Sequence, residues 1–301
     1  MSVIDIMKLT KFYGRTSGVV EVDLSVEEGE IFGFVGPNGS GKSTTIRILM
    51  GFLQPTSGSA KIFGMDAFTQ SPQIKKDVGY VPNNVDYYGD MKAMDILNYA
   101  ASFHKNVSKK RIEELCDVFE VEQKKRFSRM SVGNRKKIAI VQALMNEPRL
   151  VILDEATSGL DVAMKKRLFE QLKDANLRGA TIFFCSNNLS EVQDICGRTA
   201  VIRRGSIIDI KETSVLVGGN ARTIKVHAEG DISPVLDIFK IKDAKKVDDY
   251  VVFLYDGRMD NLIKAPANFN VIDLQIALPT LENAIMRHYE KQLEKEEEFF
   301  V

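Results

Sequence analysis

The sequence has few cysteines, no excess of charge of either sign and no long apolar run. The three cysteines, Cys116, Cys185 and Cys196, are widely spaced and lack histidines at metal-ligand spacing. This pattern predicts buried reduced thiols, and it predicts neither a disulfide framework nor a zinc site. Lys plus Arg and Asp plus Glu both number 41, and this balance gives no electrostatic argument for nucleic acid as a partner. No apolar stretch approaches the roughly 20 residues that span a bilayer, and no signal-peptide pattern is visible. We expect a cytoplasmic chain that acts at a membrane only through another subunit.

One glycine-rich stretch, residues 36–44, reads Gly-Pro-Asn-Gly-Ser-Gly-Lys-Ser-Thr and fits the pattern G-x-x-x-x-G-K-S/T. In this pattern backbone N–H groups surround a polyphosphate, the lysine reaches the terminal phosphates and the serine hydroxyl binds Mg²⁺. A short apolar strand over 31–35 precedes the loop, and a helix is predicted from Thr44 to Met50. The positive end of that helix would face the phosphates. An ordinary glycine-rich turn is the alternative. The predicted nucleotide-binding residues of this loop are Gly36, Asn38, Gly39, Ser40, Gly41, Lys42, Ser43 and Thr44.

A second polar feature follows a continuous apolar run. Residues 150–153 are Leu-Val-Ile-Leu, which is typical of a buried parallel strand, and Asp154 and Glu155 come directly after them. The C-terminal ends of parallel strands are where α/β sheets bind ligands. The phosphate-loop strand and this strand can be neighbours in the sheet, so we expect the two carboxylates near the phosphate loop. A charged strand end without function is the alternative.

The segment 124–137 carries seven basic residues and no acidic ones. A solvated face is the ordinary interpretation of such a run. Within it, residues 131–134 (Ser-Val-Gly-Asn) open a predicted helix over 135–145. Small residues and backbone N–H groups at a helix N-terminus, beside positive charge, favour an anion.

The order of predicted elements indicates an α/β fold with a second, smaller domain. Strands over 3–9 and 18–27, the second with alternating Val20, Val22, Leu24 and Val26, predict an antiparallel subdomain. Alternating strands and helices then predict a mostly parallel core sheet, interrupted by a helical subdomain over 91–120.

A Gly-Gly pair within residues 217–220 is the best linker candidate, so we place the domains at 1–219 and 220–301. The order βαββαβ in the second predicts a small α+β domain of the ferredoxin-like kind. A terminal helix from Thr280 carries an apolar stripe that packs on its own sheet or, alternatively, forms a homodimer contact.

Taken together, these motifs resemble the ATP-binding cassette (ABC) subunit of membrane transporters over roughly residues 1 to 220. Residues 36–44 look like the Walker A loop, 150–155 like Walker B, 131–134 like the cassette signature and 158–161 (Ser-Gly-Leu-Asp) like the D-loop. Tyr13 matches the aromatic residue that stacks on adenine. The C-terminal domain looks like that of cassette subunits from bacterial drug, antibiotic and peptide exporters.

The resemblance implies an ATPase in which two cassettes, identical or different, close head to tail on two ATP molecules with Mg²⁺. They would act on separate integral-membrane permease subunits at the inner face of the cell membrane. Lys42 would hold the β and γ phosphates, Ser43 and Asp154 would organise Mg²⁺, and Glu155 would polarise the attacking water. The further ATP contacts that the resemblance implies are Tyr13, Ser131, Gly133, Asn134 and Asp161.

Several residues depart from the family pattern. Asn83 stands where the family usually has a glutamine that contacts Mg²⁺, and Asn187 replaces the usual histidine near the γ phosphate. A neutral amide can donate to phosphate but cannot carry a proton, and losing such a group costs about 10² to 10⁴ in rate. Val132, Asn134 and Ala156 also differ from the usual glycine, glutamine and proline. We expect intact ATP binding and slow hydrolysis, with Asn83 and Asn187 in the catalytic set.

Three classes of function fit this pattern. The leading hypothesis is the energy-coupling ATPase of an exporter. An ATP-dependent clamp with little turnover is the second, because Asn83 and Asn187 weaken the groups that time cleavage. A soluble cassette ATPase that acts on ribosomes or DNA is the third, but such proteins typically have paired cassettes or a long coiled-coil insertion, and neither is visible in the sequence.

Overall fold

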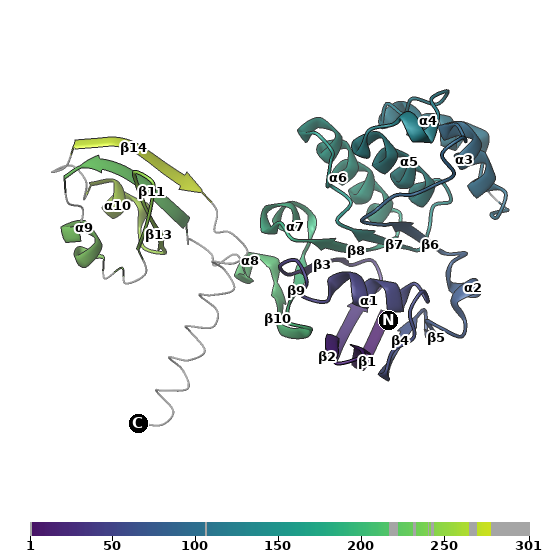
Figure 1. Ribbon diagram of the computed structural model, residues 1–301, viewed down its shortest axis with the longest axis horizontal. Coiled ribbons are helices and arrows are strands. Elements are labelled where there is room, and N and C mark those ends of the chain that lie inside the picture. The colour runs from purple at the N-terminus through teal and green to yellow at the C-terminus, as the bar shows by residue number, and fades with distance from the viewer. Residues whose placement is uncertain are drawn as a thin grey trace. The chain divides into compact units, whose positions relative to one another are not determined.

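The structure, a computed structural model, describes residues 2–105, 107–216, 222–230, 233–239, 241, 244–264 and 270–277. The chain divides into two compact units (Figure 1). The larger comprises residues up to 187 together with 194–210, and the smaller comprises 188–193 and the described residues from 211 onward. The predicted linker at 217–220 and the predicted terminal helix lie outside the described residues.

A six-stranded sheet, with strand order β10-β9-β3-β8-β7-β6, forms the centre of the larger unit. Five of its strands run parallel: β9 (Arg198–Arg203), β3 (Ile31–Val35), β8 (Thr181–Ser186), β7 (Leu150–Asp154) and β6 (Val78–Val81). The remaining strand, β10 (Ser206–Glu212), lies at one edge. Every residue of β7 and β8 is buried, as expected for strands covered on both faces.

The phosphate-loop strand and the acidic strand are not neighbours, because β8 lies between β3 and β7. The suggestion that the two can be neighbours is therefore wrong. Val35 at the end of β3 pairs with Ser186 of β8, and Asp154 at the end of β7 pairs with Cys185. The C-terminal ends of the three strands therefore lie side by side, and the carboxylates after β7 still reach the phosphate loop.

A four-stranded antiparallel sheet of order β2-β1-β4-β5 forms a second layer. Its strands are β1 (Ser2–Tyr13), β2 (Thr16–Glu27), β4 (Ser57–Ile62) and β5 (Met65–Asp66). The predicted alternation on β2 holds for Val22, Leu24 and Val26, but Val19 is buried instead of Val20. Glu21 has a φ of 45°, and the pairing with β1 shifts register there. Such a bulge moves the buried face by one residue.

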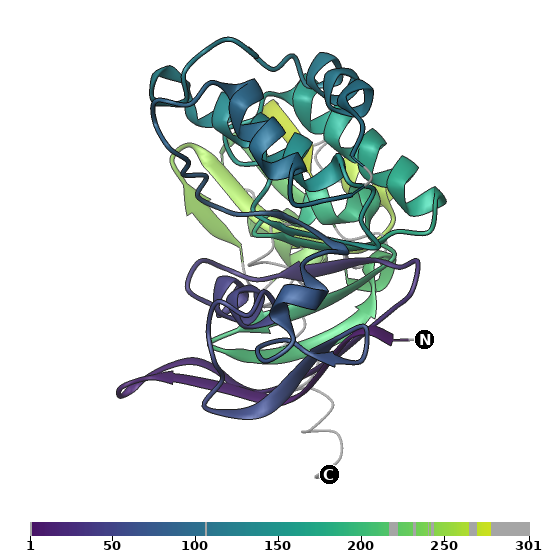
Figure 2. The ribbon, with the colours of Figure 1, turned by 90° about the vertical axis from the view of Figure 1, so that its right-hand side faces the viewer.

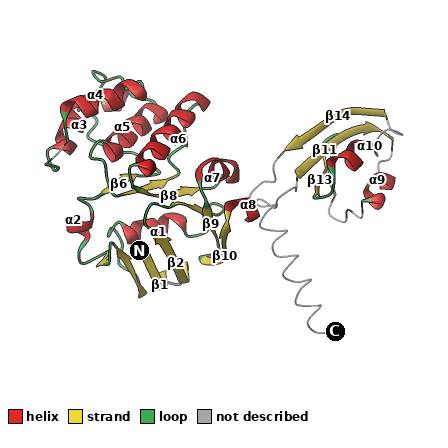
Figure 3. Cartoon of the chain, turned by 180° about the vertical axis from the view of Figure 1, so that it is seen from behind, coloured by secondary structure: helices red, strands yellow, loops and turns green. Residues whose placement is uncertain are grey.

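The helices of the larger unit lie on both faces of the six-stranded sheet. Figure 1 shows α3, α4, α5 and α6 on one face, with α1 and the four-stranded sheet on the other, and Figures 2 and 3 show the same layers from two further sides. Their bounds are α1 (Lys42–Leu49), α2 (Ser71–Ile74), α3 (Ala93–Ala101), α4 (Lys109–Val118), α5 (Val132–Leu144) and α6 (Val162–Leu177). Since α3 and α4 fall between β6 and β7, the predicted helical subdomain is confirmed.

The cysteines and the lengths of the apolar helices bear on two of the predictions. All three cysteines are buried and none of them forms a disulfide, as predicted. Burial is the main cause that raises the pKa of each thiol, to about 11 for Cys116. Within the part of the chain that is described, no helix is long and apolar enough to cross a membrane.

The smaller unit contains a four-stranded antiparallel sheet of order β12-β13-β11-β14. Its elements are the part of α7 (Leu189–Ile195) that covers 189–193, and α8 (Thr213–Leu216), β11 (Arg222–Glu229), α9 (Ser233–Ile238), β12 (Lys245–Val247), β13 (Tyr250–Tyr255), α10 (Met259–Lys264) and β14 (Asn270–Ala277). Ile224, Phe253 and Leu262 lie in its buried core. The predicted βαββαβ order is present from β11 to β14, while the ferredoxin-like assignment and the boundary after residue 219 stay predictions.

Candidate functional site

The loop between β3 and α1 forms a concave backbone segment. At the points where it comes closest to neighbouring residues, only glycine fits. A Cβ atom on Gly36 would lie 2.2 Å from the carbonyl oxygen of Ile202, and one on Gly41, where φ is 110°, would lie 2.7 Å from Val19. Gly39 also has a positive φ, of 77°, a conformation that glycine adopts at no steric cost. Ser40 is 2% exposed, and its Oγ has no hydrogen-bond partner among the residues that the structure describes. A buried hydroxyl without a partner in such a concave segment fits a polar ligand.

Lys42, the first residue of α1, brings a buried positive charge into this loop. Its Nζ donates to the carbonyl oxygens of Gly36 at 2.7 Å and Pro37 at 3.2 Å, and lies 3.4 Å from Oε1 of Glu155. An ammonium group within a glycine loop at a helix N-terminus is suited to a polyphosphate.

Ser43 and Asp154 form the oxygen pair that was predicted to hold Mg²⁺. The Ser43 Oγ donates to Oδ1 of Asp154 at 3.3 Å, although the two residues are far apart in sequence. Burial raises the pKa of Asp154, and the hydrogen bond from Ser43 opposes that rise. A hydroxyl and a carboxylate oxygen side by side are hard ligands of the kind that Mg²⁺ prefers, so these residues fit the ion.

Glu155 is held next to them in an unusual backbone conformation. Its φ is 50°, in the left-handed region where a non-glycine residue carries strain that the surroundings must maintain. One carboxylate oxygen accepts from the backbone N–H of Asn187 at 3.3 Å, and the other faces Lys42. Burial raises the pKa of Glu155, while the nearby Lys42 lowers it.

The two asparagines that replace family residues have different environments. The Asn187 Nδ2 donates to Oδ1 of Asn38 at 3.3 Å, so this side chain reaches the phosphate loop. Asn83 is exposed, and none of the described residues forms a hydrogen bond with its side chain. The structure therefore brings Asn187 to the predicted site and does not join the Asn83 amide to Ser43 or Asp154.

Tyr13 lies beside the phosphate loop and remains 45% exposed. Its hydroxyl is 3.5 Å from Oγ1 of Thr44, and a Cβ on Gly18 would lie 2.8 Å from its ring. An exposed aromatic ring at this position is available for stacking with a base, and its contact with adenine stays a prediction.

The signature and D-loop residues pack against each other. Ser131 is the N-cap of α5, since its Oγ accepts from the Asn134 N–H at 3.3 Å, and the helix therefore begins three residues earlier than predicted. Asp161 caps α6 by accepting from Met164 N–H at 2.9 Å. A Cβ on Gly133 would lie 2.4 Å from the carbonyl oxygen of Gly159. No hydrogen bond or ion pair joins these residues to the phosphate loop among the described residues.

Replacing Gly133 by alanine is expected to destabilise the larger unit by about 1 to 3 kcal/mol, because the added methyl meets backbone that cannot rotate away. Urea unfolding followed by circular dichroism measures this change. Gly197→Ala is the matched control, since a Cβ there has nothing within 4 Å. Equal stability of the two variants would contradict the close approach of Gly133 and Gly159.

Lys136 is a residue of the site that the sequence analysis missed. The basic segment 124–137 was interpreted as a solvated face, which is wrong for this lysine, because it is only 1% exposed. Its Nζ donates to the carbonyl oxygens of Pro82 at 2.9 Å, Asn83 at 2.6 Å and Glu155 at 3.3 Å. The signal was present in the helical spacing, since Lys136 lies four and eight residues before the buried Ile140 and Leu144.

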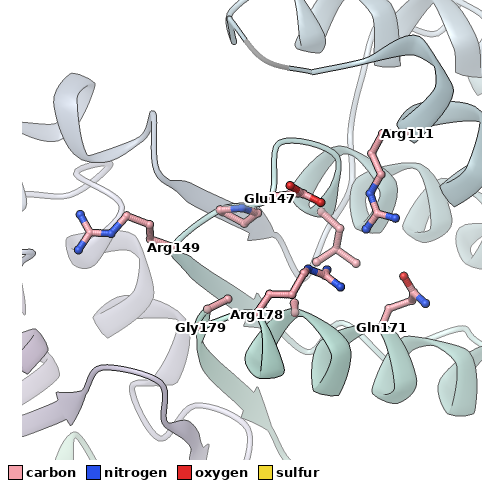
Figure 4. Close-up of a pocket in the computed structure, with 10 residues that line it drawn as sticks. Arg111, Glu147, Arg149, Gln171, Arg178 and Gly179 are labelled. Atoms are coloured by element: carbon pink, nitrogen blue, oxygen red, sulfur yellow. The ribbon is translucent and has the colours of Figure 1, made fainter.

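A second hollow, of about 320 Å³, lies apart from these residues (Figure 4). Arg111, Gln171 and Arg178 line it, whereas the Arg149 guanidinium points away, 3.8 Å from Glu28 and over the ring of Phe63. None of the predicted site residues lines this hollow.

Comparison with known proteins agrees with this geometry. The family model described as ABC transporter matches residues 19–158. The chain is 34% identical over 230 residues to an uncharacterized ABC transporter ATP-binding protein, YdbJ of Bacillus subtilis strain 168, and the match covers 75% of this chain and 74% of YdbJ. It is also 34% identical over 213 residues to the bacitracin transport ATP-binding protein BcrA of Bacillus licheniformis, covering 69% of each.

The fold has similar counterparts among solved structures. One is the dimeric, post-hydrolysis ATP-binding cassette MJ0796 bound to ADP and Pi, with a TM-score of 0.64 at 22% identity. The match covers 70% of this chain and 98% of that chain. At 22% identity, this similarity shows the fold of the larger unit and nothing more.

Proposed function

Since this chain belongs to the ABC transporter ATP-binding proteins, we propose that it is the energy-coupling ATPase of an exporter, working at the inner face of the cell membrane with separate permease subunits. The observation that carries the proposal is the convergence of Lys42, Ser43, Asp154 and Glu155 at one edge of the parallel sheet. The relative BcrA is named for bacitracin transport and another relative for Nod factor export, which supports an export role.

Each of these residues has a distinct task in the proposed reaction. The loop backbone and Lys42 bind and orient the ATP phosphates, and Ser43 and Asp154 would hold Mg²⁺, which neutralises phosphate charge when bound. Glu155 orients a water molecule and takes up its proton. Asn187 donates an N–H towards the terminal phosphate, and Tyr13 stacks on the base.

We propose further that a second cassette, either another copy or a related chain, completes each ATP site. Within the described residues, no hydrogen bond or ion pair joins Ser131, Gly133, Asn134 or Asp161 to the phosphate loop of their own chain. Their contact with a partner's ATP is therefore part of the proposal, and there the Asn134 side chain would exchange its bond to Glu122. The dimeric cassette with a similar fold supports this arrangement.

Asn187→His is expected to raise the rate of ATP hydrolysis about tenfold or more, because an imidazole can carry the proton and the positive charge that an amide cannot. Steady-state phosphate release at saturating Mg²⁺ and ATP measures the change. Asn188→His, one residue further along, is the control. A rate that is unchanged or lower at position 187 would show that local compensation makes Asn187 neutral.

The proposed function is tested on the purified full-length chain. ATP with Mg²⁺ should shift the chain from monomer to dimer in size-exclusion chromatography with light scattering, and a single-turnover experiment should show complete hydrolysis. Affinity purification from membranes solubilised in detergent should recover integral-membrane proteins with the tagged chain. Failure to bind ATP would refute the proposal.

An ATP-dependent clamp is the second candidate, favoured by the asparagines at positions 83 and 187. It predicts the same ATP-dependent dimer with almost no product formed in a single turnover. The single-turnover yield therefore separates the two functions.

A further inference from the structure

We infer that Lys136 is a positioning residue. Its hydrogen bonds hold the carbonyl groups of Asn83 and Glu155 next to helix α5. A movement at the start of that helix would therefore move the Glu155 carboxylate of the same chain. The inference rests on the proposed ATPase function. It concerns a side chain whose ammonium donates to backbone carbonyls and therefore acts through other residues.

The contacts of Lys136 account for the whole bonding capacity of its ammonium group. An ammonium has three N–H donors and no acceptor, and its three partners here are backbone carbonyls from two separate segments. Pro82 and Asn83 follow strand β6, and Glu155 follows strand β7. One side chain thus holds both segments to α5.

Stability alone does not explain a lysine at this position. Burial lowers the pKa of Lys136, opposed by the nearby Asp154 and Glu155 carboxylates, so desolvation disfavours the charge. Buried charged groups can often be replaced by apolar residues of similar volume at little cost. A methionine would fill the same space but would take the lysine donor away from all three carbonyl groups, and that of Glu155 would keep only the Ser158 N–H at 3.2 Å. This points to the bonds themselves as the reason for the lysine.

The position of Lys136 makes it a link between two sites. It lies about one and a half helical turns after Ser131, the N-cap of α5, where we propose that the partner's ATP is contacted. Glu155 belongs to the chain's own ATP site and is held at a strained φ of 50°. A displacement of α5 would therefore pull directly on the backbone of Glu155 and on the loop that carries Asn83.

Lys136→Met tests this role because it keeps the volume and removes the donors. Amide hydrogen exchange should become about tenfold faster in two separated segments, 82–87 and 155–160, since both lose the same anchor. The maximal rate of ATP hydrolysis should fall about tenfold, with ATP affinity within about threefold of the parent, because displacement of Glu155 affects the reaction and not the binding. Lys173→Met, on an exposed part of α6, is the control and should change neither property.

Two further variants keep the test decisive. Lys136→Gln retains N–H donors without the charge and should restore part of the protection in both segments, even if the methionine variant folds poorly. In a Glu155→Gln background, Lys136→Met should add almost nothing to the loss of rate, because the two act through one carboxylate.

The outcomes separate the inference from the proposed function. Exchange that is unchanged in either segment, or rate losses that multiply in the double variant, would overturn the role of Lys136. A parent protein that hydrolyses no ATP would refute the ATPase proposal, while the exchange measurements would still decide whether Lys136 anchors both segments.

Discussion

Glu155→Gln is expected to lower the maximal rate of ATP hydrolysis by about 10² to 10⁴-fold, the range for loss of a general base. The substitution keeps the size of the side chain and both of its polar atoms. It removes the negative charge that faces Lys42 at 3.4 Å and the capacity to take up a proton from water. The ATP dissociation constant should stay within about threefold of the parent, since Glu155 acts on the transition state.

Single-turnover hydrolysis measures the loss of rate, and equilibrium binding of a fluorescent ATP analogue measures whether the affinity is kept. Glu170→Gln, on an exposed position of α6, is the matched control and should behave as the parent. Because the variant would bind ATP without cleaving it, it should also accumulate as a dimer in the presence of ATP. A rate near that of the parent would assign proton uptake to another group.

Lys42→Met is expected to weaken ATP binding about a hundredfold or more, because hydrogen bonds to charged groups contribute about 1.5 to 3 kcal/mol each and the ammonium is expected to reach two phosphates. The substitution also leaves the half-buried Glu155 carboxylate without its cation. The pKa of Glu155 should then rise further, since Lys42 is the nearby charge that lowers it.

Isothermal titration calorimetry with ATP and Mg²⁺ measures the loss of affinity. Lys173→Met serves again as the control, and thermal unfolding without nucleotide shows whether the fold is kept. Affinity that survives the loss of Lys42 would mean that the loop backbone alone binds the phosphates.

The sequence predicted the features that depend on local order. The strand, the glycine loop and the helix around Lys42 are consecutive in the chain, so their geometry follows from the spacing of a few residues. The same holds for the apolar run before Asp154, which can be buried only as an inner strand. Both predictions were confirmed in the fold.

The features that were missed depend on segments that are far apart in the sequence. Residues 150–154 do not reveal that a later strand, β8, separates them from β3. The burial of Val19 in place of Val20 depends on a bulge that the pairing of β1 with β2 creates. Lys136 could be recognised as buried from its helical spacing, but its three carbonyl partners come from loops that only the folded chain brings together.

The burial of every cysteine has a practical consequence. Cys116, Cys185 and Cys196 are buried, and burial raises the pKa of their thiols, so in the folded protein they should react slowly with alkylating reagents, which attack the thiolate. A cysteine introduced at an exposed position, such as Val162 near the start of α6, should therefore accept a spin label or a fluorophore selectively. Opening and closing of an assembled transporter can then be followed by spectroscopy without first removing the native thiols.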